Sequence, residues 1–119
     1  MSDFYCNQVL KGNVAVSVVF ETDQVLAFHH TQPYFEYHIV IIPKQHIESL
    51  SSAHAVESTL AVDFLKAIHY VCDKLERENG GCRVSSNVGD YQSTRHLHFY
   101  VHSGKRLRNE DGSPSENIG

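Results

Sequence analysis

The segment 95–102, with the sequence RHLHFYVH, constrains the fold of this chain more than any other. Polar and apolar residues alternate through it, and a period of two is typical of a β-strand that buries one face. The alternation divides the side chains into a polar set (His96, His98, Tyr100 and His102) and an apolar set (Leu97, Phe99 and Val101). We therefore expect a strand over 94–102 with its apolar side against the core and polar groups spaced about 7 Å apart on the other side.

Other segments predict the partners of this strand. Branched and apolar runs predict strands over 14–20, 24–29, 37–42 and 82–87. Apolar residues at steps of three or four predict a long amphipathic helix over 54–79, and a short helix is expected over 3–10. This order predicts an α+β domain in which about five antiparallel strands pack with one long and one short helix.

The length of 119 residues is that of a single domain. We assign residues 1–104 to this domain because they carry all of the expected elements. Residues 105–119 are polar with almost no apolar side chain, so we expect a mobile tail there.

The charge balance limits the partners. Ten Lys and Arg residues against fourteen Asp and Glu residues give a formal net charge of −4. A nucleic-acid polymer is not expected as a partner, because proteins that bind polyanions need a surplus of basic residues. A single nucleotide stays possible, since it needs only a local site. Nine histidines also make the charge of the chain sensitive to pH near about 6.5.

Cysteine usage and hydropathy bear on the location of the protein. The three cysteines stand at wide spacing, and the N-terminal residues lack the basic and apolar pattern of a secretion signal. The longest uncharged apolar run, 39–42, is too short to span a bilayer. We expect a cytoplasmic protein with no membrane partner.

A row of imidazoles on one strand face has three possible explanations. It can bind a transition metal through His96, His98 and His102, it can supply a nucleophile with acid–base groups, or it can simply lie on a wet sheet face. The residues before the strand favour the catalytic explanation, because they offer small side chains and backbone amides that can hold phosphate oxygens. These residues are Asn87, Gly89, Gln92 and Ser93.

The same residues resemble a known family. The segment 96–101, HLHFYV, resembles the histidine triad (HIT) signature His-φ-His-φ-His-φ-φ, in which φ is apolar, with Tyr100 in place of the third histidine. The segments 26–29 and 38–47, with Pro33 between them, are similar in order and spacing to the other characteristic HIT segment. The resemblance extends over roughly residues 3–104, and it implies the HIT-like fold.

The resemblance implies nucleotide chemistry. It implies a hydrolase or transferase that acts at the α-phosphate of nucleoside phosphoramidates or related phosphoanhydrides through a nucleotidyl-histidine intermediate. His98 matches the nucleophile, which needs no deprotonation when its imidazole is neutral. The resemblance also implies that its other ring nitrogen donates to a backbone carbonyl of the same strand. His96 and His38 would orient and polarise this centre, and Ser93 would lie near the phosphate and leaving group.

The resemblance further implies a purine nucleotide, or a conjugate of one, as the ligand, and a homodimer as the assembly. Positions that match nucleotide-binding residues are Asn87, Gly89, Gln92, Phe4, Tyr5, Phe28, His30 and Val40. Plain core packing is the alternative for the aromatic residues of this set, and for Phe28 the two explanations weigh equally.

Two residues depart from the family pattern. Tyr100 keeps a hydroxyl but cannot carry a proton at neutral pH, so we expect slower turnover or altered substrate choice. His30 stands where the phosphoramidase branch has an Asp that accepts from the ribose hydroxyls, which changes what the site offers the ribose. These departures keep open the alternative of a nucleotide-binding or regulatory module with weak or lost catalysis. The row of His96, His98 and His102 keeps open a third alternative, a small metal-binding β protein.

Part of this family also carries zinc on a Cys-x-x-Cys pair and two histidines. The matching positions here are Asp3, Cys6, His46 and His96, so half of the cysteine pair is missing. We therefore expect no metal and no other cofactor.

Overall fold

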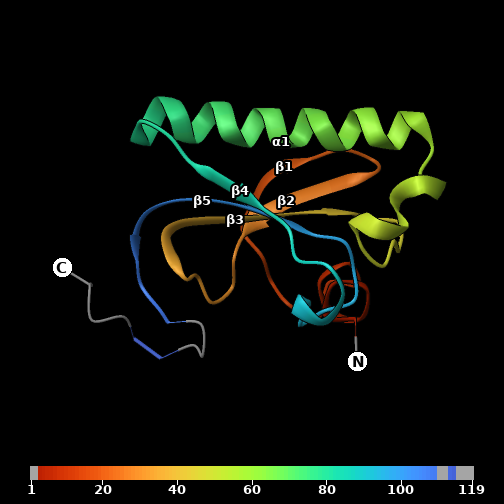
Figure 1. Ribbon diagram of the computed structural model, residues 1–119, viewed down its shortest axis with the longest axis horizontal. Coiled ribbons are helices and arrows are strands. Elements are labelled where there is room, and N and C mark those ends of the chain that lie inside the picture. Colours follow the sequence, from red (N-terminus) through yellow and green to blue (C-terminus); the bar gives the residue numbers. More distant parts are fainter. Residues whose placement is uncertain (1–2, 110–112, 115–119) are drawn as a thin grey trace.

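The computed structural model describes residues 3–109 and 113–114. Within these residues, five antiparallel strands form one sheet in the order β1-β2-β3-β5-β4, and a long helix lies across one of its faces (Figure 1). The elements are β1 (Val18–Glu21), β2 (Val25–His29), β3 (Phe35–Pro43), α1 (Ser58–Asn79), β4 (Arg83–Ser85) and β5 (Phe99–Arg106). The α+β fold expected from the sequence is confirmed.

The central strands are buried on both faces. On β3, Ile39 and Ile41 pack toward α1, whereas Val40 and Ile42 pack into a second apolar cluster on the opposite face. The helix contributes its buried stripe to the first cluster, through Leu60, Ala67, Val71 and Leu75. The near-continuous apolar run of β3 is therefore explained by cover on both sides.

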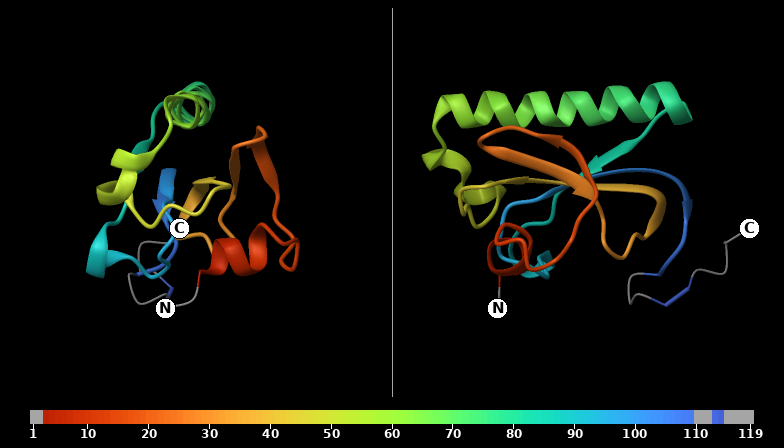
Figure 2. Two further views of the ribbon diagram at one scale, coloured as in Figure 1. Left: turned by 90° about the vertical axis from the view of Figure 1, so that its right-hand side faces the viewer. Right: turned by 180° about the vertical axis from the view of Figure 1, so that it is seen from behind.

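The short turn η1 (Tyr5–Val9) covers only part of the face opposite α1 (Figure 2). Tyr5 and Val9 pack there on the cluster that contains Phe28 and Val40. The polar side chains of β3, β4 and β5 lie on the remaining part of this face. Cross-strand pairing aligns His38 with His102, and His102 with Arg83, in one row.

Several element boundaries differ from those expected. The strand expected over 94–102 begins only at Phe99 and continues to Arg106. The preceding residues keep the alternation of faces without strand pairing, because Leu97 N–H donates to the Ile47 carbonyl at 2.6 Å. The long helix begins at Ser58, and residues 50–55 form a separate 3-10 turn, η2 (Leu50–Ala55).

Two expectations concern the ends of the elements and of the chain. β1 and β4 are shorter than expected, because pairing with β2 and β5 covers only their described spans. The predicted mobility of 105–119 falls in part on residues 110–112 and 115–119, which lie outside the described residues. Across the described part of the chain, α1 is too polar to serve as a membrane span, and no other helix is long enough.

Candidate active site

His98 lies at the entry to β5 and is 2% exposed. Its Nδ1 lies 2.7 Å from the His96 carbonyl oxygen, so Nδ1–H donates to that backbone oxygen. The proton on Nδ1 leaves Nε2 with a lone pair when the ring is neutral. Burial lowers the pKa of His98, which favours the neutral ring. The fold therefore presents an imidazole whose nucleophilic nitrogen is Nε2.

Tyr100 contacts that nitrogen directly. Its hydroxyl oxygen lies 3.1 Å from His98 Nε2, and the O–H is the available donor. Burial raises the pKa of Tyr100, so the phenol stays protonated. Tyr100, which stands at the third position of the triad pattern, therefore donates its neutral O–H to the lone pair of His98 Nε2. That lone pair is then not available for attack on a ligand.

His38 supplies a hydrogen-bond donor without a partner. Its Nδ1 accepts from the Tyr34 backbone N–H at 3.0 Å, so its proton resides on Nε2. Among the described side chains, His38 Nε2 is the only buried nitrogen or oxygen that has no hydrogen-bond partner. Burial lowers the pKa of His38 to about 3, and the ring stays neutral. A buried N–H of this kind is ready to receive an acceptor oxygen.

His30 is stacked on His38, with ring centroids 4.4 Å apart. Its Nδ1 already accepts from the Gln32 backbone N–H at 3.0 Å, so Nε2–H is the group it can offer a ligand. Burial lowers the pKa of His30 to about 4. His30 therefore offers a ligand a hydrogen-bond donor, whereas an aspartate at this position would offer an acceptor.

His30, His38 and Tyr100 line a cavity of about 630 Å³ on the sheet face opposite α1. His98 is not among the lining residues, and it adjoins the cavity through its contact with Tyr100. Of the residues singled out from the sequence, six line it, namely His30, His38, Asn87, Ser93, Tyr100 and His102. Sequence reasoning missed other lining residues, namely Gln32, Tyr34, Phe35, Ser85, Tyr91 and Arg106. Only Ser85 had a local signal in the sequence, because it stands two residues before Asn87 and a strand places such residues on the same face.

Gln92 and Gly89 shape the loop instead of lining the cavity. Gln92 is 3% exposed, and its amide accepts from Gly89 N–H and donates to the carbonyls of Glu48 and Thr94. Gly89 has a φ of 67°, which a side chain would disfavour, and it begins the turn η3 (Gly89–Tyr91). Both residues thereby hold Asn87 and Ser93 in position.

The expected base-binding residues lie in the cluster under η1. Phe28 and Val40 are 1% exposed, and Phe4 and Tyr5 pack with them. None of these four residues is among those that line the 630 Å³ cavity. Tyr5 still lies close to His98, with the two ring centroids 5.1 Å apart.

His96 faces away from the cavity, toward the N-terminal residues. Its Nε2–H donates to the Pro43 carbonyl at 2.8 Å, and its Nδ1 lies 2.9 Å from Asp3 Oδ2 and 3.2 Å from Cys6 Sγ. His46 Nδ1 lies 2.6 Å from the same Asp3 oxygen. The contribution of His96 to the site of His98 is therefore its backbone carbonyl.

Four potential metal ligands come together in this cluster. One ligand atom each from Asp3, Cys6, His46 and His96 lies within 4.8 Å of the others. Two imidazole nitrogens, one thiol and one carboxylate match the ligands that zinc takes in four-coordinate sites, and the Pro43 carbonyl orients His96 as an outer-shell partner. A bound zinc would link η1 to the entry of β5. The set differs from the expected alternative of His96, His98 and His102, which does not form such a group within residues 3–109 and 113–114.

Comparisons with known proteins agree with one another on the family and the fold. A family model described as "HIT domain" matches residues 11–107. An uncharacterized 13.2 kDa HIT-like protein of Azospirillum brasilense is 35% identical in an alignment of 104 residues, and the match covers 84% of this chain and 84% of that one. A solved HIT family hydrolase from Legionella pneumophila Philadelphia 1 is 25% identical with a TM-score of 0.75, and the match covers 92% of this chain and 98% of that one. A histidine triad nucleotide-binding protein from Candida albicans is 28% identical with a TM-score of 0.70, covering 84% of this chain and 73% of that one.

The four-residue cluster predicts a metal-binding stoichiometry. Protein made without a histidine tag should bind one equivalent of Zn²⁺, and Co²⁺ in its place should give a thiolate-to-metal charge-transfer band because Cys6 is a ligand. Cys6→Ser should remove that band, and Asp3→Asn should weaken binding by about tenfold or more. Cys72→Ser, a cysteine outside the cluster, is the matched control. The absence of stoichiometric metal, or a band that survives Cys6→Ser, would contradict this assignment.

The buried imidazoles predict an unusual response to acid. Because folding lowers the pKa values of His30 and His38 to about 4 and about 3, the unfolded chain binds more protons below pH 6.5. Their contribution to the free energy of unfolding is complete above about pH 6.5 and is lost as the pH falls through the folded-state values. The side-chain NMR signals of both rings, assigned with His30→Asn and His38→Asn, should keep their neutral positions down to about pH 5. Titration of either ring midway between pH 6 and 7 would disprove the burial argument.

Proposed function

The chain belongs to the HIT family, and on that premise we propose that it is a nucleotide hydrolase or transferase that uses His98 as its nucleophile. Its substrates are nucleoside phosphoramidates or related phosphoanhydrides, and the reaction occurs at the α-phosphate. The observation that carries this proposal is the hydrogen bond from His98 Nδ1–H to the His96 carbonyl, because it reserves Nε2 for attack.

The proposed reaction has two steps. His98 Nε2 attacks the α-phosphorus, and the bond from phosphorus to the leaving group breaks with its electron pair on the leaving group. The imidazole gains positive charge in this step, and the His96 carbonyl stabilises it through Nδ1–H. Water then attacks the nucleotidyl-histidine, which releases the nucleotide and restores the neutral ring.

Donors around the cavity support the charge that develops on phosphate oxygens. His38 Nε2–H is buried and without a partner, and Asn87 and Ser93 line the same cavity. A donor that is fixed before the reaction needs no reorganisation in the transition state. These three residues are therefore proposed to bind the reacting phosphate, and Tyr100 is proposed to share its proton with the leaving group.

A purine nucleotide or nucleotide conjugate is the proposed ligand. The cavity of about 630 Å³ is within the usual range for a ligand of this size. His30 is proposed to donate to an acceptor oxygen of the sugar or phosphate through Nε2–H. The cluster of Phe4, Tyr5, Phe28 and Val40 supports the base-binding proposal only by its position beside His98 and Tyr100.

A homodimer is the proposed assembly. β4 is a terminal strand of the sheet, and its three residues are all exposed, with Val84 at 45%. An edge of this kind pairs readily with a second copy around a two-fold axis. The free thiols of Cys6, Cys72 and Cys82 favour a reducing compartment, so we also propose a cytoplasmic location.

The second candidate function is a nucleotide-binding module with weak catalysis. The contact of 3.1 Å between the Tyr100 hydroxyl and His98 Nε2 favours it, because that hydrogen bond must break before attack. Tyrosine also cannot shuttle a proton at neutral pH as readily as histidine. The two candidates share the same ligand and differ in turnover.

The hydrolase proposal is tested with adenosine 5′-phosphoramidate. The wild-type protein should release AMP, and His98→Ala should lower kcat/KM by at least about a thousandfold because the nucleophile is lost. His69→Ala, which alters an exposed histidine of α1, should retain wild-type activity. AMP release by the wild-type protein that does not exceed that of His98→Ala would refute the proposal.

Tyr100 discriminates between the two candidates. Tyr100→His should raise kcat by about tenfold or more, since an imidazole at this position can deliver a proton to the leaving group at neutral pH. The measurement is steady-state hydrolysis of the same substrate, with nucleotide affinity checked by calorimetry. Strong turnover in the wild-type protein with no gain in the variant would show that Tyr100 is no impediment, and turnover only in the variant would favour the binding module.

A further inference from the structure

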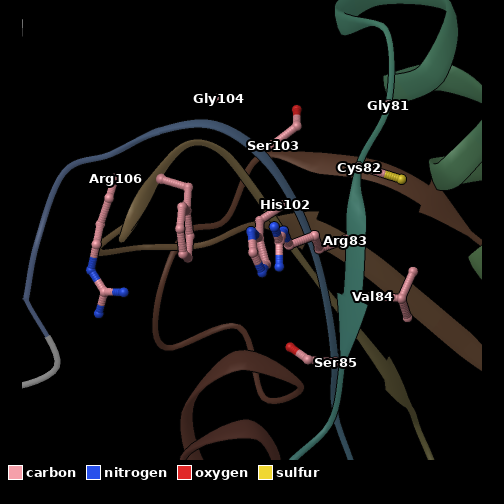
Figure 3. Close-up of a pocket in the computed structure, with 10 residues that line it drawn as sticks. Gly81, Cys82, Arg83, Val84, Ser85, His102, Ser103, Gly104 and Arg106 are labelled. Carbon is pink, nitrogen blue, oxygen red and sulfur yellow. The ribbon is translucent and has the colours of Figure 1, made fainter.

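The cavity beside His98 continues into a second one. The second cavity has a volume of about 830 Å³ and shares Phe35, Ser85, His102 and Arg106 with the first. It extends along β4 and β5 as far as Gly81 and Gly104 (Figure 3). A ligand held at His98 therefore has room to continue along the sheet face, away from the nucleophile.

Two arginines lie along this continuation. Arg83 is the cross-strand partner of His102, and the two side chains point toward one another in Figure 3. Arg106 lies on the other side, with its guanidinium carbon 5.7 Å from the centroid of the Phe35 ring. Phe35 in turn stacks on His102 with centroids 3.9 Å apart and an angle of 13°. The two aromatic rings thus stand between the two guanidinium groups and limit their movement.

Neither arginine is neutralised within the described residues. No carboxylate there lies within 4.0 Å of the Arg83 or Arg106 guanidinium groups. Arg106 Nε donates to the Arg108 carbonyl, which leaves its terminal nitrogens for a ligand. The nearby Glu36 carboxylate accepts from the Lys105 backbone N–H at 2.6 Å.

The surface of both cavities is rich in donors. Among residues 3–109 and 113–114, no Asp or Glu lines either cavity. On the side near His98, His30 and His38 each use Nδ1 to accept a backbone N–H, so both rings offer N–H to the cavity. Such a surface favours a ligand made mostly of acceptor oxygens.

We propose that Arg83, His102 and Arg106 form a binding subsite for a second phosphoryl group, so that the preferred substrate carries a phosphorylated leaving group. This inference rests on the proposed function, because it takes the α-phosphate to lie at His98. His102 is two residues beyond Tyr100 on β5, which is about 7 Å along the strand. A diphosphate or triphosphate chain that begins at His98 can follow β5 to this subsite.

The subsite also has a catalytic consequence. When His98 Nε2 attacks the α-phosphorus, the bond to the bridging oxygen breaks, and its electron pair stays on the leaving phosphate. The leaving group therefore gains negative charge as the transition state forms. Two fixed guanidinium groups therefore stabilise the transition state more than the ground state. A neutral amine leaving group carries no such charge, so the arginines do not stabilise its departure.

Binding of inorganic tripolyphosphate tests the subsite without any reaction. Isothermal titration should show binding to the wild-type protein, and the Arg83→Gln/Arg106→Gln variant should bind at least about tenfold more weakly. The variant Lys66→Gln/Arg77→Gln, which removes the same charge from α1, should bind within about twofold of the wild type. Circular dichroism and thermal unfolding establish that the variants fold. Equal affinity of the arginine variant and the wild type, or no binding to the wild type, would overturn the proposal.

Kinetics separate this inference from the proposed function. Relative to the wild type, the Arg83→Gln/Arg106→Gln variant should lose at least about tenfold more in kcat/KM with diadenosine triphosphate than with adenosine 5′-phosphoramidate. An equal loss on both substrates would overturn the subsite. Tripolyphosphate binding that depends on the arginines, with hydrolysis of neither substrate, would uphold the subsite and refute the hydrolase.

Discussion

The hydrogen bond from His98 Nδ1–H to the His96 carbonyl is the contact on which the rest of the site depends. It sets the tautomer of the His98 ring, and it depends on the backbone conformation of residues 96–98, which lead into β5. The buried side chain of His96 stabilises this conformation, because its Nε2–H donates to the Pro43 carbonyl and its Nδ1 contacts the Asp3 carboxylate. The N-terminal cluster and His98 are therefore held by the same short segment, since His96 contacts Asp3 through its side chain and His98 through its carbonyl.

Much of the fold and part of the site were predictable from the sequence. Alternation over 96–102 gave the correct faces, since Leu97 and Val101 lie in the core on the α1 side. It did not give the strand boundary, because Leu97 bonds to Ile47, a loop residue that no local pattern connects with it. The helix stripe predicted α1, and its start moved because η2 forms a separate turn.

The parts of the site that sequence reasoning missed depend on contacts between distant segments. Phe35 meets His102 only through the pairing of β3 with β5, and Arg83 meets it through the pairing with β4. Gln92 had the residue type of a ligand donor, but Glu48 lies across a loop and takes up its amide. Asp3 and Cys6 were expected to leave a metal site incomplete, and the fold brings them together with His46 and His96.

The most direct measurement of the central claim is mass-spectrometric mapping of the protein after rapid acid-free quenching of a reaction with a nucleoside phosphoramidate. The account predicts one nucleotidyl group per active site, attached to His98 through Nε2, whose amount rises and then decays as free nucleotide appears. Modification of another residue, or hydrolysis without any covalent intermediate on His98, would contradict the account.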